Sequence, residues 1–343
     1  MSEPGRTGED AYRRAGVDLA AASRAVELIK DVAVGASRPE VASAVGGFAG
    51  LVDLGDGRLL AASTDGVGTK VDVARRVGKL DTVGIDCVAM SANDVVCTGA
   101  EPLFFLDYLA VERMVPEEVS AIVGGVAEGC RRAGCALLGG ETAEHPGTLP
   151  PGAFDLAGFC VGLVREEELL DPGRVRPGDV LLGFRSSGLH ANGFSLVRRA
   201  IDEGGLDLDE HFVELGRTLG DELLEPTLIY VRPVLELSRA GLVRSAAHIT
   251  GGGLLENLPR ALPPGLGAVV DRDAWAPHPI FGVIARAAGV EPGDLFGVFN
   301  MGIGLVVVVG ASDTEDAMQL ARTAGWAASV VGEVREGSGI LLR

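Results

Sequence analysis

The sequence predicts a mixed α/β protein of two domains, each with a mixed or antiparallel sheet covered by helices. Its 343 residues suffice for two ordinary cores, and 47% of them are hydrophobic. Short apolar segments of strand length alternate with longer segments whose apolar residues recur at helical spacing. Turn-forming residues cluster around 171–179. We therefore expect a flexible tail over 1–14, an N-terminal domain over 15–170 and a C-terminal domain over 171–343.

The first half should begin with a helix and continue with alternating strands and helices. Apolar residues at near-helical spacing between Val17 and Ile29 predict the first helix. The elements expected after it are strands over 48–54 and 58–64 joined by a hairpin turn at 55–57, a helix over 82–98, a strand over 103–111, a helix opened by Pro116, and strands over 135–138 and 154–164.

The second half follows a similar alternation. A proline inside a helical pattern marks a start or a kink, so Pro233 should lie near the beginning of its helix. The expected elements are a strand over 180–184, a loop over 185–192, a helix over 193–202, a helix over 228–240, a strand ending at 250, a helix opened by the glycines at 251–253, strands near 268–271 and 303–309, and a closing helix and strand.

The composition excludes several classes of function. A net charge of −18 argues against nucleic-acid partners and anionic membrane surfaces, which attract Lys and Arg. No apolar run approaches the roughly 20 residues that span a bilayer, and the N-terminus is polar, so we expect no membrane segment and a cytoplasmic protein. The five cysteines form no CxxC pair, which favours reduced, packed thiols over a zinc site.

The run from Ser63 to Lys70 is the first candidate for ligand binding. It follows an apolar strand-like segment, and Gly66 and Gly68 would let backbone N–H groups approach an anion. Asp65 could bind Mg²⁺, and Lys70 could neutralise a phosphate oxygen as a mobile charge. The spacing is not that of a Walker A loop. On its own, the run is more typical of a tight turn.

Glycine-bearing segments recur at four further junctions between predicted elements. A helix N-terminus preceded by glycines binds anions, because its unpaired N–H groups and its dipole point the same way. Any one of them could be only a turn, but their joint occurrence favours phosphate binding. These segments are residues 139–142, 186–193, 250–253 and 300–304.

Oxygen ligands and histidines accompany these loops. Mg²⁺ usually takes one or two carboxylates plus phosphate oxygens, so the acids near the loops suffice for one or two ions. Asp107 lies in an apolar strand, where either a metal or a structural hydrogen bond would offset its burial. His190 and His248 are candidates for proton transfer or oxyanion support, and the alternative is that they only fix their loops. The oxygen donors are Asp65, Asp94, Asp107, Glu141, Glu144 and the amide of Asn93.

Taken together and in this order, the motifs resemble the aminoimidazole ribonucleotide synthetase family, also called phosphoribosylformylglycinamidine cyclo-ligases. The resemblance spans roughly residues 11–340. The segments that carry it are 15–18, 46–48, 64–70, 84–94, 99–108, 139–144, 186–196 and 250–257. The chain departs from the expected pattern at Ala49, where a glycine is expected, and at Met301.

The resemblance implies a reaction and an assembly. The reaction is ATP-dependent closure of formylglycinamidine ribonucleotide to aminoimidazole ribonucleotide, with release of ADP and phosphate, in purine biosynthesis. ATP would phosphorylate the formyl amide oxygen, and the amidine nitrogen would then attack the activated carbon. The assembly is a homodimer in which the N-terminal strands of two subunits form a shared barrel, with the nucleotide near the interface.

The resemblance also assigns roles to individual residues. Asp65 and Asp94 match acids near Mg²⁺ and the ATP phosphates, and Lys30 falls in a segment used near the nucleotide. From the residues and the resemblance together, the catalytic candidates are His190, His248, Lys70 and Asp65, and the candidate metal ligands are Asp65, Asp94 and Asp107. The candidates for nucleotide binding are Lys30, Gly66, Gly68, Thr69, Lys70, Asn93, Gly139, Gly140, Glu141, Thr142, Asn192, Gly251 and Gly252.

Two other classes of function are weighed against this one. Related enzymes make selenophosphate or phosphorylate thiamine monophosphate, but a selenophosphate synthetase would carry a reactive Cys near its N-terminus, and the first Cys here is Cys87. A nucleotide-binding subunit without turnover is the second class. The presence of Asp65, Lys70, Asp94 and both loop histidines, His190 and His248, argues against it.

Overall fold

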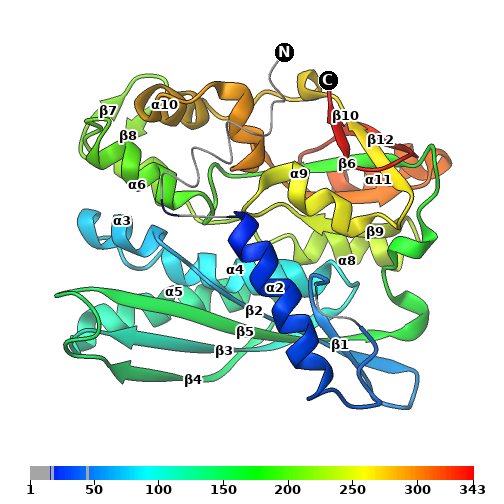
Figure 1. Ribbon diagram of the computed structural model, residues 1–343, viewed down its shortest axis with the longest axis horizontal. Coiled ribbons are helices and arrows are strands. Elements are labelled where there is room, and N and C mark those ends of the chain that lie inside the picture. The colour runs from blue at the N-terminus through cyan, green and yellow to red at the C-terminus, as the bar shows by residue number, and fades with distance from the viewer. Residues whose placement is uncertain (1–15, 17–18, 44–45) are drawn as a thin grey trace.

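The computed structural model describes residue 16, residues 19–43 and residues 46–343, so the predicted N-terminal tail lies outside the described residues. Two mixed sheets of five and six strands, each flanked by helices, confirm the predicted mixed α/β class (Figure 1). In the described part of the chain, no helix is long and apolar enough to cross a membrane.

The N-terminal sheet has the strand order β1-β2-β5-β3-β4. Its β3–β4 pair is parallel and its other pairs are antiparallel. The predicted hairpin at residues 55–57 joins its first two strands. The strands are β1 (Gly50–Asp53), β2 (Arg58–Gly66), β3 (Glu101–Val111), β4 (Ala136–Glu144) and β5 (Phe154–Arg165).

One prediction for this sheet is wrong. The strand expected over 135–138 does not stop before a glycine loop, because β4 continues through Gly139, Gly140, Glu141 and Thr142 to Glu144. Pairing with β3 supplies backbone hydrogen-bond partners along this stretch, so tertiary pairing overrides the turn tendency of the two glycines. These residues lie mostly exposed on an edge strand, and they do not form a loop.

Helices α4 (Val83–Val96) and α5 (Pro116–Ala133) cover one face of this sheet (Figure 1). The two helices approach closely at glycines. A side chain at Gly84 would overlap the backbone of Ile122 and Val126, and one at Gly125 would overlap the backbone of Asp81. Small residues at this crossing therefore set the distance between the helices.

We expect Gly84→Ala to destabilise the fold, because the added methyl group must displace the α5 backbone. Overpacking of this kind costs about 1–3 kcal/mol or more, which exceeds the helix propensity gained by alanine. Denaturant unfolding measures the effect. Gly124→Ala is the matched control, since a side chain there meets no atom within 4 Å. Equal stability of the two variants would contradict the close crossing.

The opposite face of the N-terminal sheet carries large exposed apolar side chains. Leu103, Tyr108, Leu138 and Phe159 are 43%, 37%, 65% and 48% exposed. No described helix packs on this face, which is the lower one in Figure 1. We call it the open sheet face. An apolar face of this kind is typical of a protein–protein contact.

The C-terminal sheet has the order β13-β10-β12-β6-β11-β9 and is mixed through its parallel β10–β13 pair. Its strands are β6 (Val180–Arg185), β9 (Val243–His248), β10 (Leu266–Val270), β11 (Ile303–Val309), β12 (Ala328–Glu336) and β13 (Ile340–Leu342). The longer helices of this domain are α6 (Phe194–Asp202), α8 (Val231–Arg239), α10 (Pro279–Ala288) and α11 (Thr314–Thr323).

Shorter elements complete the fold. The first described helix, α2 (Leu19–Val34), has mostly exposed side chains and crosses the front of the view in Figure 1. The helix predicted over 228–240 begins only at Val231, which puts Pro233 in its first turn, where a missing N–H costs nothing. The remaining elements are α3 (Lys70–Val77), α7 (Leu219–Leu223), α9 (Gly253–Asn257) and the pair β7 (His211–Phe212) and β8 (Arg217–Thr218).

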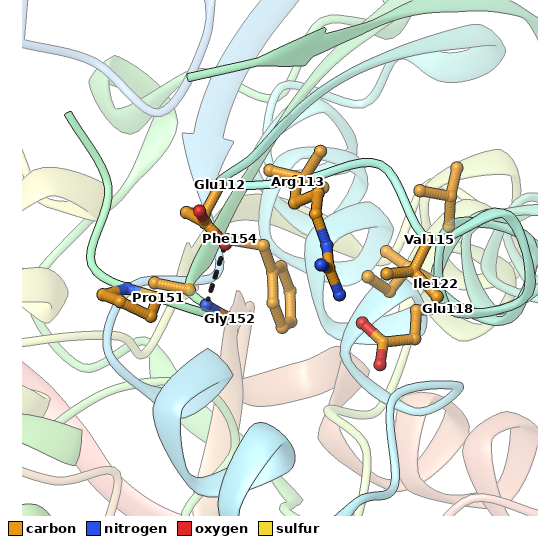
Figure 2. Close-up of a pocket in the computed structure, with 11 residues that line it drawn as sticks. Glu112, Arg113, Val115, Glu118, Ile122, Pro151, Gly152 and Phe154 are labelled. Atoms are coloured by element: carbon orange, nitrogen blue, oxygen red, sulfur yellow. Dashed lines mark hydrogen bonds between the residues drawn. The ribbon is translucent and has the colours of Figure 1, made fainter. Parts of the chain in front are cut away.

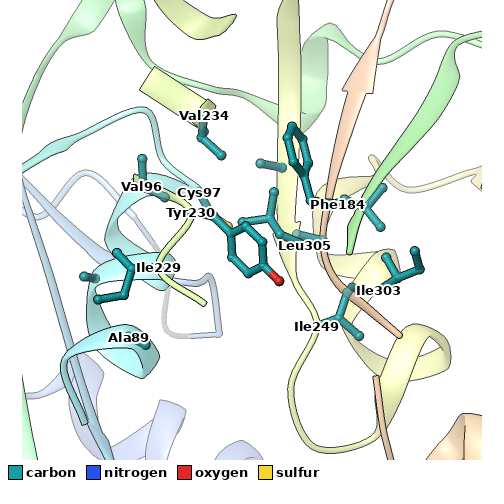
Figure 3. Packing of buried hydrophobic residues seen from close by; sticks show 14 of the residues in the cluster. Ala89, Val96, Cys97, Phe184, Ile229, Tyr230, Val234, Ile249, Ile303 and Leu305 are labelled. Carbon is teal, nitrogen blue, oxygen red and sulfur yellow. The ribbon is translucent and has the colours of Figure 1, made fainter. Parts of the chain in front are cut away.

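The two domains share a core built around α4. Nearly every residue of this helix is buried, which fits a helix enclosed on all sides. Figure 3 shows Ala89 and Val96 of α4 on one side of Tyr230, and Phe184 and Leu305 of the C-terminal sheet on the other. Three polar residues of α4, Asp86, Asn93 and Asp94, bond to Thr227, Tyr230 and His248 of the C-terminal domain. We call them the polar edge of α4, and they lie at the domain interface.

Candidate functional site

Two carboxylates from the N-terminal domain lie near the domain interface. Asp65 stands near the end of β2 and Asp94 near the end of α4. Burial and the charge of Asp94 raise the pKa of Asp65 to about 6. Ser63 Oγ donates to Asp94 Oδ2 at 3.3 Å, and the N–H of Gly66 donates to Asp65 Oδ1 at 2.8 Å. A divalent cation between the two acids would relieve their mutual repulsion.

His248, at the end of β9, links the C-terminal domain to Asp94. Its ring is 1% exposed, and Nδ1 lies 3.0 Å from Asp94 Oδ1. Nε2 lies 3.4 Å from the amide nitrogen of Asn93. An amide nitrogen can only donate, and one of its two hydrogens bonds the carbonyl of Leu228 at 2.9 Å. Nε2 of His248 is therefore the acceptor of the other hydrogen. Through the contact of Nδ1 with Oδ1, His248 orients the Asp94 carboxylate.

The glycine loop after β9 is held by Asn257. The amide of Asn257 donates to the carbonyls of Gly251 and Gly253 at 3.0 and 2.9 Å. Gly252 has φ +84°, and a side chain there would collide with Glu256, so glycine is required. This loop opens α9, as predicted, and the N–H of Gly253 donates to the carbonyl of Thr250 at 3.0 Å.

Arg260 brings a cation to the same region. Its guanidinium stacks 3.8 Å from the centre of the Phe48 ring and donates to the carbonyl of Gly47 at 2.9 Å. Its charge acts on Asp65 to lower that group's pKa, against the larger raising effects of burial and Asp94. Lys30 lies against Gly46, so it borders the Gly46–Gly47 segment that Arg260 contacts. Its ammonium pairs with Glu27 at 2.8 Å.

The loop over 186–193 contains a strained histidine. His190 has φ +64°, is 2% exposed, and accepts the N–H of Ser187 at Nε2 over 3.2 Å. Burial lowers its pKa well below the usual value, so the ring is neutral with its proton on Nδ1. Nδ1 has no hydrogen-bond partner among the described residues. A left-handed conformation at such a residue is typical of functional loops.

The side chain of Asn300 holds the loop over 186–193 through three hydrogen bonds. Its amide donates to the carbonyls of Gly188 and Leu189 at 3.0 and 3.1 Å, and its Oδ1 accepts from Ser186 Oγ at 3.0 Å. Asn192 reaches across the interface to Met90 Sδ, 3.5 Å away. Because Asn300 belongs to the segment over 300–304, this predicted loop supports the loop that carries His190.

Lys70 differs from its predicted role as a mobile charge. The ammonium is fully buried and forms an ion pair with Asp86 at 2.8 Å. Burial lowers its pKa, against the raising effect of Asp86. The neighbouring Thr69 hydroxyl lies 3.5 Å from Ser195 Oγ of α6. The expectation of a mobile ammonium is wrong, because the second domain encloses the side chain.

Asp107 and residues 139–142 lie apart from the two acids. Asp65 and Asp107 both face Gly158 in the strand pairing, so two strand spacings, about 10 Å, separate their backbones. Asp107 packs against Gly140 of the next strand, and burial raises its pKa. Within the described residues, no three His, Cys, Asp or Glu side chains form a metal-binding cluster. Only Asp65 and Asp94 of the predicted ligands are brought together.

Three positions of this site were missed by sequence reasoning. Asn257 and Asn300 organise the two glycine loops, and Arg260 supplies the nearby cation. A polar residue at a fixed distance after a glycine run could have signalled Asn257. Asn300 and Arg260 become visible only when segments distant in sequence meet.

A separate pocket of about 390 Å³ opens beside the start of α5. Arg113, Glu118, Ile122 and Phe154 line it, as Figure 2 shows. Glu112 accepts the N–H of Gly152 at its edge. None of the predicted site residues lines this pocket.

Comparison with known proteins identifies the family. Residues 46–164 match the model described as AIR synthase related protein, N-terminal domain, and residues 176–342 match the corresponding C-terminal domain. The phosphoribosylformylglycinamidine cyclo-ligase of Myxococcus xanthus is 50% identical over 333 residues, covering 96% of each chain. The chain belongs to the phosphoribosylformylglycinamidine cyclo-ligase family. Cyclo-ligases of Geobacillus kaustophilus and Lachnospira eligens are 47% and 46% identical, covering 96% and 95% of this chain and 97% of their own.

Solved structures of other proteins share the fold of this chain. A thiamine-monophosphate kinase from Stenotrophomonas maltophilia superposes with a TM-score of 0.65 at 21% identity, covering 90% of this chain and 93% of its own. A structure described as AaThiL complexed with AMPPCP and TMP gives a TM-score of 0.66 at 17% identity, covering 92% and 91%. At these identities the likeness concerns the fold alone.

Proposed function

We propose that the chain catalyses the ATP-dependent closure of formylglycinamidine ribonucleotide to aminoimidazole ribonucleotide in the cytoplasm. The observation that carries this proposal is the Asp65–Asp94 pair. Asp65 begins the glycine loop over 65–70, and Asp94 contacts His248, which stands two residues before the glycine loop over 250–253. Asp65 has no ion-pair partner in the described part of the chain, and its pKa is raised to about 6. The family membership supplies the reaction, and the two acids would hold the Mg²⁺ ion whose positive charge phosphoryl transfer needs.

The two acids fit one Mg²⁺ ion. Magnesium takes one or two carboxylates and completes its shell with water and phosphate oxygens, so the absence of a third acid among the described residues is no obstacle. When bound, the ion would neutralise charge on the transferred phosphoryl group. Ser63 and His248 hold Asp94 from two sides, which limits the orientation of its carboxylate.

The proposed chemistry has two steps. The formyl amide oxygen attacks the γ-phosphorus of ATP, and ADP leaves. An amidine nitrogen then attacks the activated carbon and loses a proton, while the C–O bond breaks and phosphate departs. Both steps depend on positioning and charge stabilisation. The neutral Nδ1–H of His190 would donate to an oxygen of the substrate, because Nε2 is already occupied by Ser187.

We further propose a homodimer formed through the open sheet face. Four large apolar side chains on one face of a monomer would be covered by the same face of a second copy. Gly139, Gly140, Glu141 and Thr142 lie on the edge strand β4, about 14 Å from β2 at three strand spacings. In the dimer, these residues would serve the nucleotide site of the partner. A barrel shared by the two sheets is the expected form.

The function is tested with purified protein and MgATP. We expect ADP and aminoimidazole ribonucleotide to form in equal amounts when formylglycinamidine ribonucleotide is added. Thiamine monophosphate and selenide serve as alternative substrates in parallel reactions. Turnover with either one alone would favour the other superfamily activities. Binding of ATP without ADP formation would indicate a nucleotide-binding subunit.

His248→Ala is expected to lower turnover by about 10- to 100-fold, because Asp94 loses the group that orients it. Binding of an ATP analogue should weaken less than turnover does. His248→Asn provides the control, since its amide can still donate to Asp94, and it should recover part of the activity. Equal losses of binding and turnover would point instead to a damaged loop.

A further inference from the structure

A buried ion pair between Lys70 and Asp86 contacts two segments of the C-terminal domain, the loop over 186–193 and residues 225–227. Lys70 begins α3 and Asp86 lies in the first turn of α4, and both side chains are 0% exposed. Their atoms Nζ and Oδ2 are 2.8 Å apart. Both residues belong to the N-terminal domain, whereas their remaining partners belong to the C-terminal domain. The pair is therefore part of the domain interface.

The ammonium has three close partners. Lys70 Nζ donates to the carbonyls of His190 at 3.1 Å and Glu225 at 2.9 Å. Its charge is balanced by the carboxylate of Asp86, whose Oδ2 lies 2.8 Å away. Releasing Nζ toward a phosphate would leave Asp86 as an unpaired carboxylate in the core, which is strongly unfavourable.

Asp86 extends the connection to a third segment. Its Oδ1 accepts from the backbone N–H of Thr227 at 2.8 Å and from Thr227 Oγ1 at 2.6 Å. Seven residues further along α4, Asn93 Oδ1 accepts the N–H of Tyr230 at 2.8 Å. The polar edge of α4 thus holds the extended segment over 225–230 against the N-terminal domain.

Lys70 also helps to hold the backbone of His190 in its left-handed conformation. A non-glycine residue with φ +64° persists only where its surroundings hold it, and Lys70 binds its carbonyl directly. Lys70 also follows the loop that carries Asp65. One side chain therefore connects the loop of the proposed metal ligand to the loop of the proposed hydrogen-bond donor.

We propose that Lys70 is a positioning residue. Together with Asp86, it fixes the Asp65–Lys70 loop relative to the His190 loop and contacts no phosphate. The inference rests on the proposed roles of Asp65 and His190. It assigns to Lys70 an effect on the rate of reaction, with little effect on nucleotide affinity.

The test uses the double variant Lys70→Met/Asp86→Asn in the full-length chain. Removing both charges avoids an unpaired buried carboxylate, and the amide oxygen that replaces the carboxylate of Asp86 can still accept from Thr227. Calorimetry measures the Kd of a non-hydrolysable ATP analogue with Mg²⁺, and ADP release measures kcat and KM. We expect the Kd to stay within about threefold of wild type and kcat to fall by about 10- to 100-fold, the size of loss that small displacements cause.

A rise of about 100-fold or more in the Kd of the analogue would show that Lys70 contacts phosphate and would overturn the proposal. An unchanged kcat would overturn it as well. Thr227→Val provides a second variant that keeps both charges and removes one bond to Asp86, so a smaller fall in kcat at constant Kd is expected. If the wild-type chain itself lacks turnover, the proposed function fails, while the binding measurement still decides whether Lys70 contacts phosphate.

Discussion

Asp65→Asn is expected to reduce turnover by at least about 100-fold while leaving the fold intact. The substitution keeps the shape of the side chain and removes a negative charge that the proposed metal requires. Turnover should stay low at saturating Mg²⁺, because an amide is a poor replacement for the carboxylate. Asp56→Asn, in the exposed hairpin where Asp56 pairs with Arg58, is the matched control and should be active. Near-normal turnover of Asp65→Asn would refute the metal role.

The same substitution should stabilise the ligand-free protein at neutral pH. In the folded state the pKa of Asp65 is raised to about 6, whereas an unfolded aspartate has a pKa near 3.9. Between these values the folded state binds more protons, so stability falls as pH rises through this window. Asparagine removes this loss, on the order of 1 kcal/mol after allowance for solvent screening. Thermal unfolding from pH 4 to 8 measures the difference.

The pH dependence of activity follows from the same group. The metal requires ionised Asp65, so kcat/KM at limiting Mg²⁺ should fall as pH drops below about 6. Higher Mg²⁺ concentrations should move the fall to lower pH, because the ion competes with the proton. His190 should not contribute, since burial keeps it neutral over this range.

Phe159→Asp is expected to convert the proposed dimer to a monomer and to abolish most of its activity. Phe159 lies on the open sheet face and is 48% exposed, so in the dimer its replacement would bury an unpaired carboxylate. Loss of the partner would also remove the contribution of residues 139–142 to the nucleotide site. Sedimentation and turnover are measured on the same samples.

Val213→Asp provides the control for this experiment. Val213 is also apolar and is 94% exposed, but it lies in the C-terminal domain beside β7. It should leave both the assembly and the activity unchanged. A wild-type chain that sediments as a monomer, or a Phe159→Asp variant that remains an active dimer, would contradict an interface at the open sheet face.

Much of the fold could be predicted because local signals agree with tertiary demands. The hairpin at 55–57, the helix opened by Pro116 and the strand over 303–309 each combine an apolar pattern with a turn or capping residue. The segment over 139–142 fails for the opposite reason. Its glycines signal a turn, but pairing with β3 outweighs this local preference.

The candidate site was predicted only in part. Asp65 lies in the glycine run over 63–70 and Asp94 follows Asn93 at the end of the segment over 84–94, so local patterns indicate both acids. In the structure the charge of Asp94 acts on Asp65. Asn300 and Arg260 act across 100 or more residues, on Gly188 and Gly47 respectively. No local pattern contains such contacts, so a single sequence does not reveal them.

The sequence by itself determined the class of fold and most of the elements, because periodicity and turn chemistry act over a few residues. Only the tertiary structure decided what Lys70 does. A lysine beside a glycine loop has the same local appearance whether it faces a phosphate or a buried aspartate. Closure of the second domain over α4 encloses its ammonium with Asp86 and two carbonyls, and this burial fixes its partners.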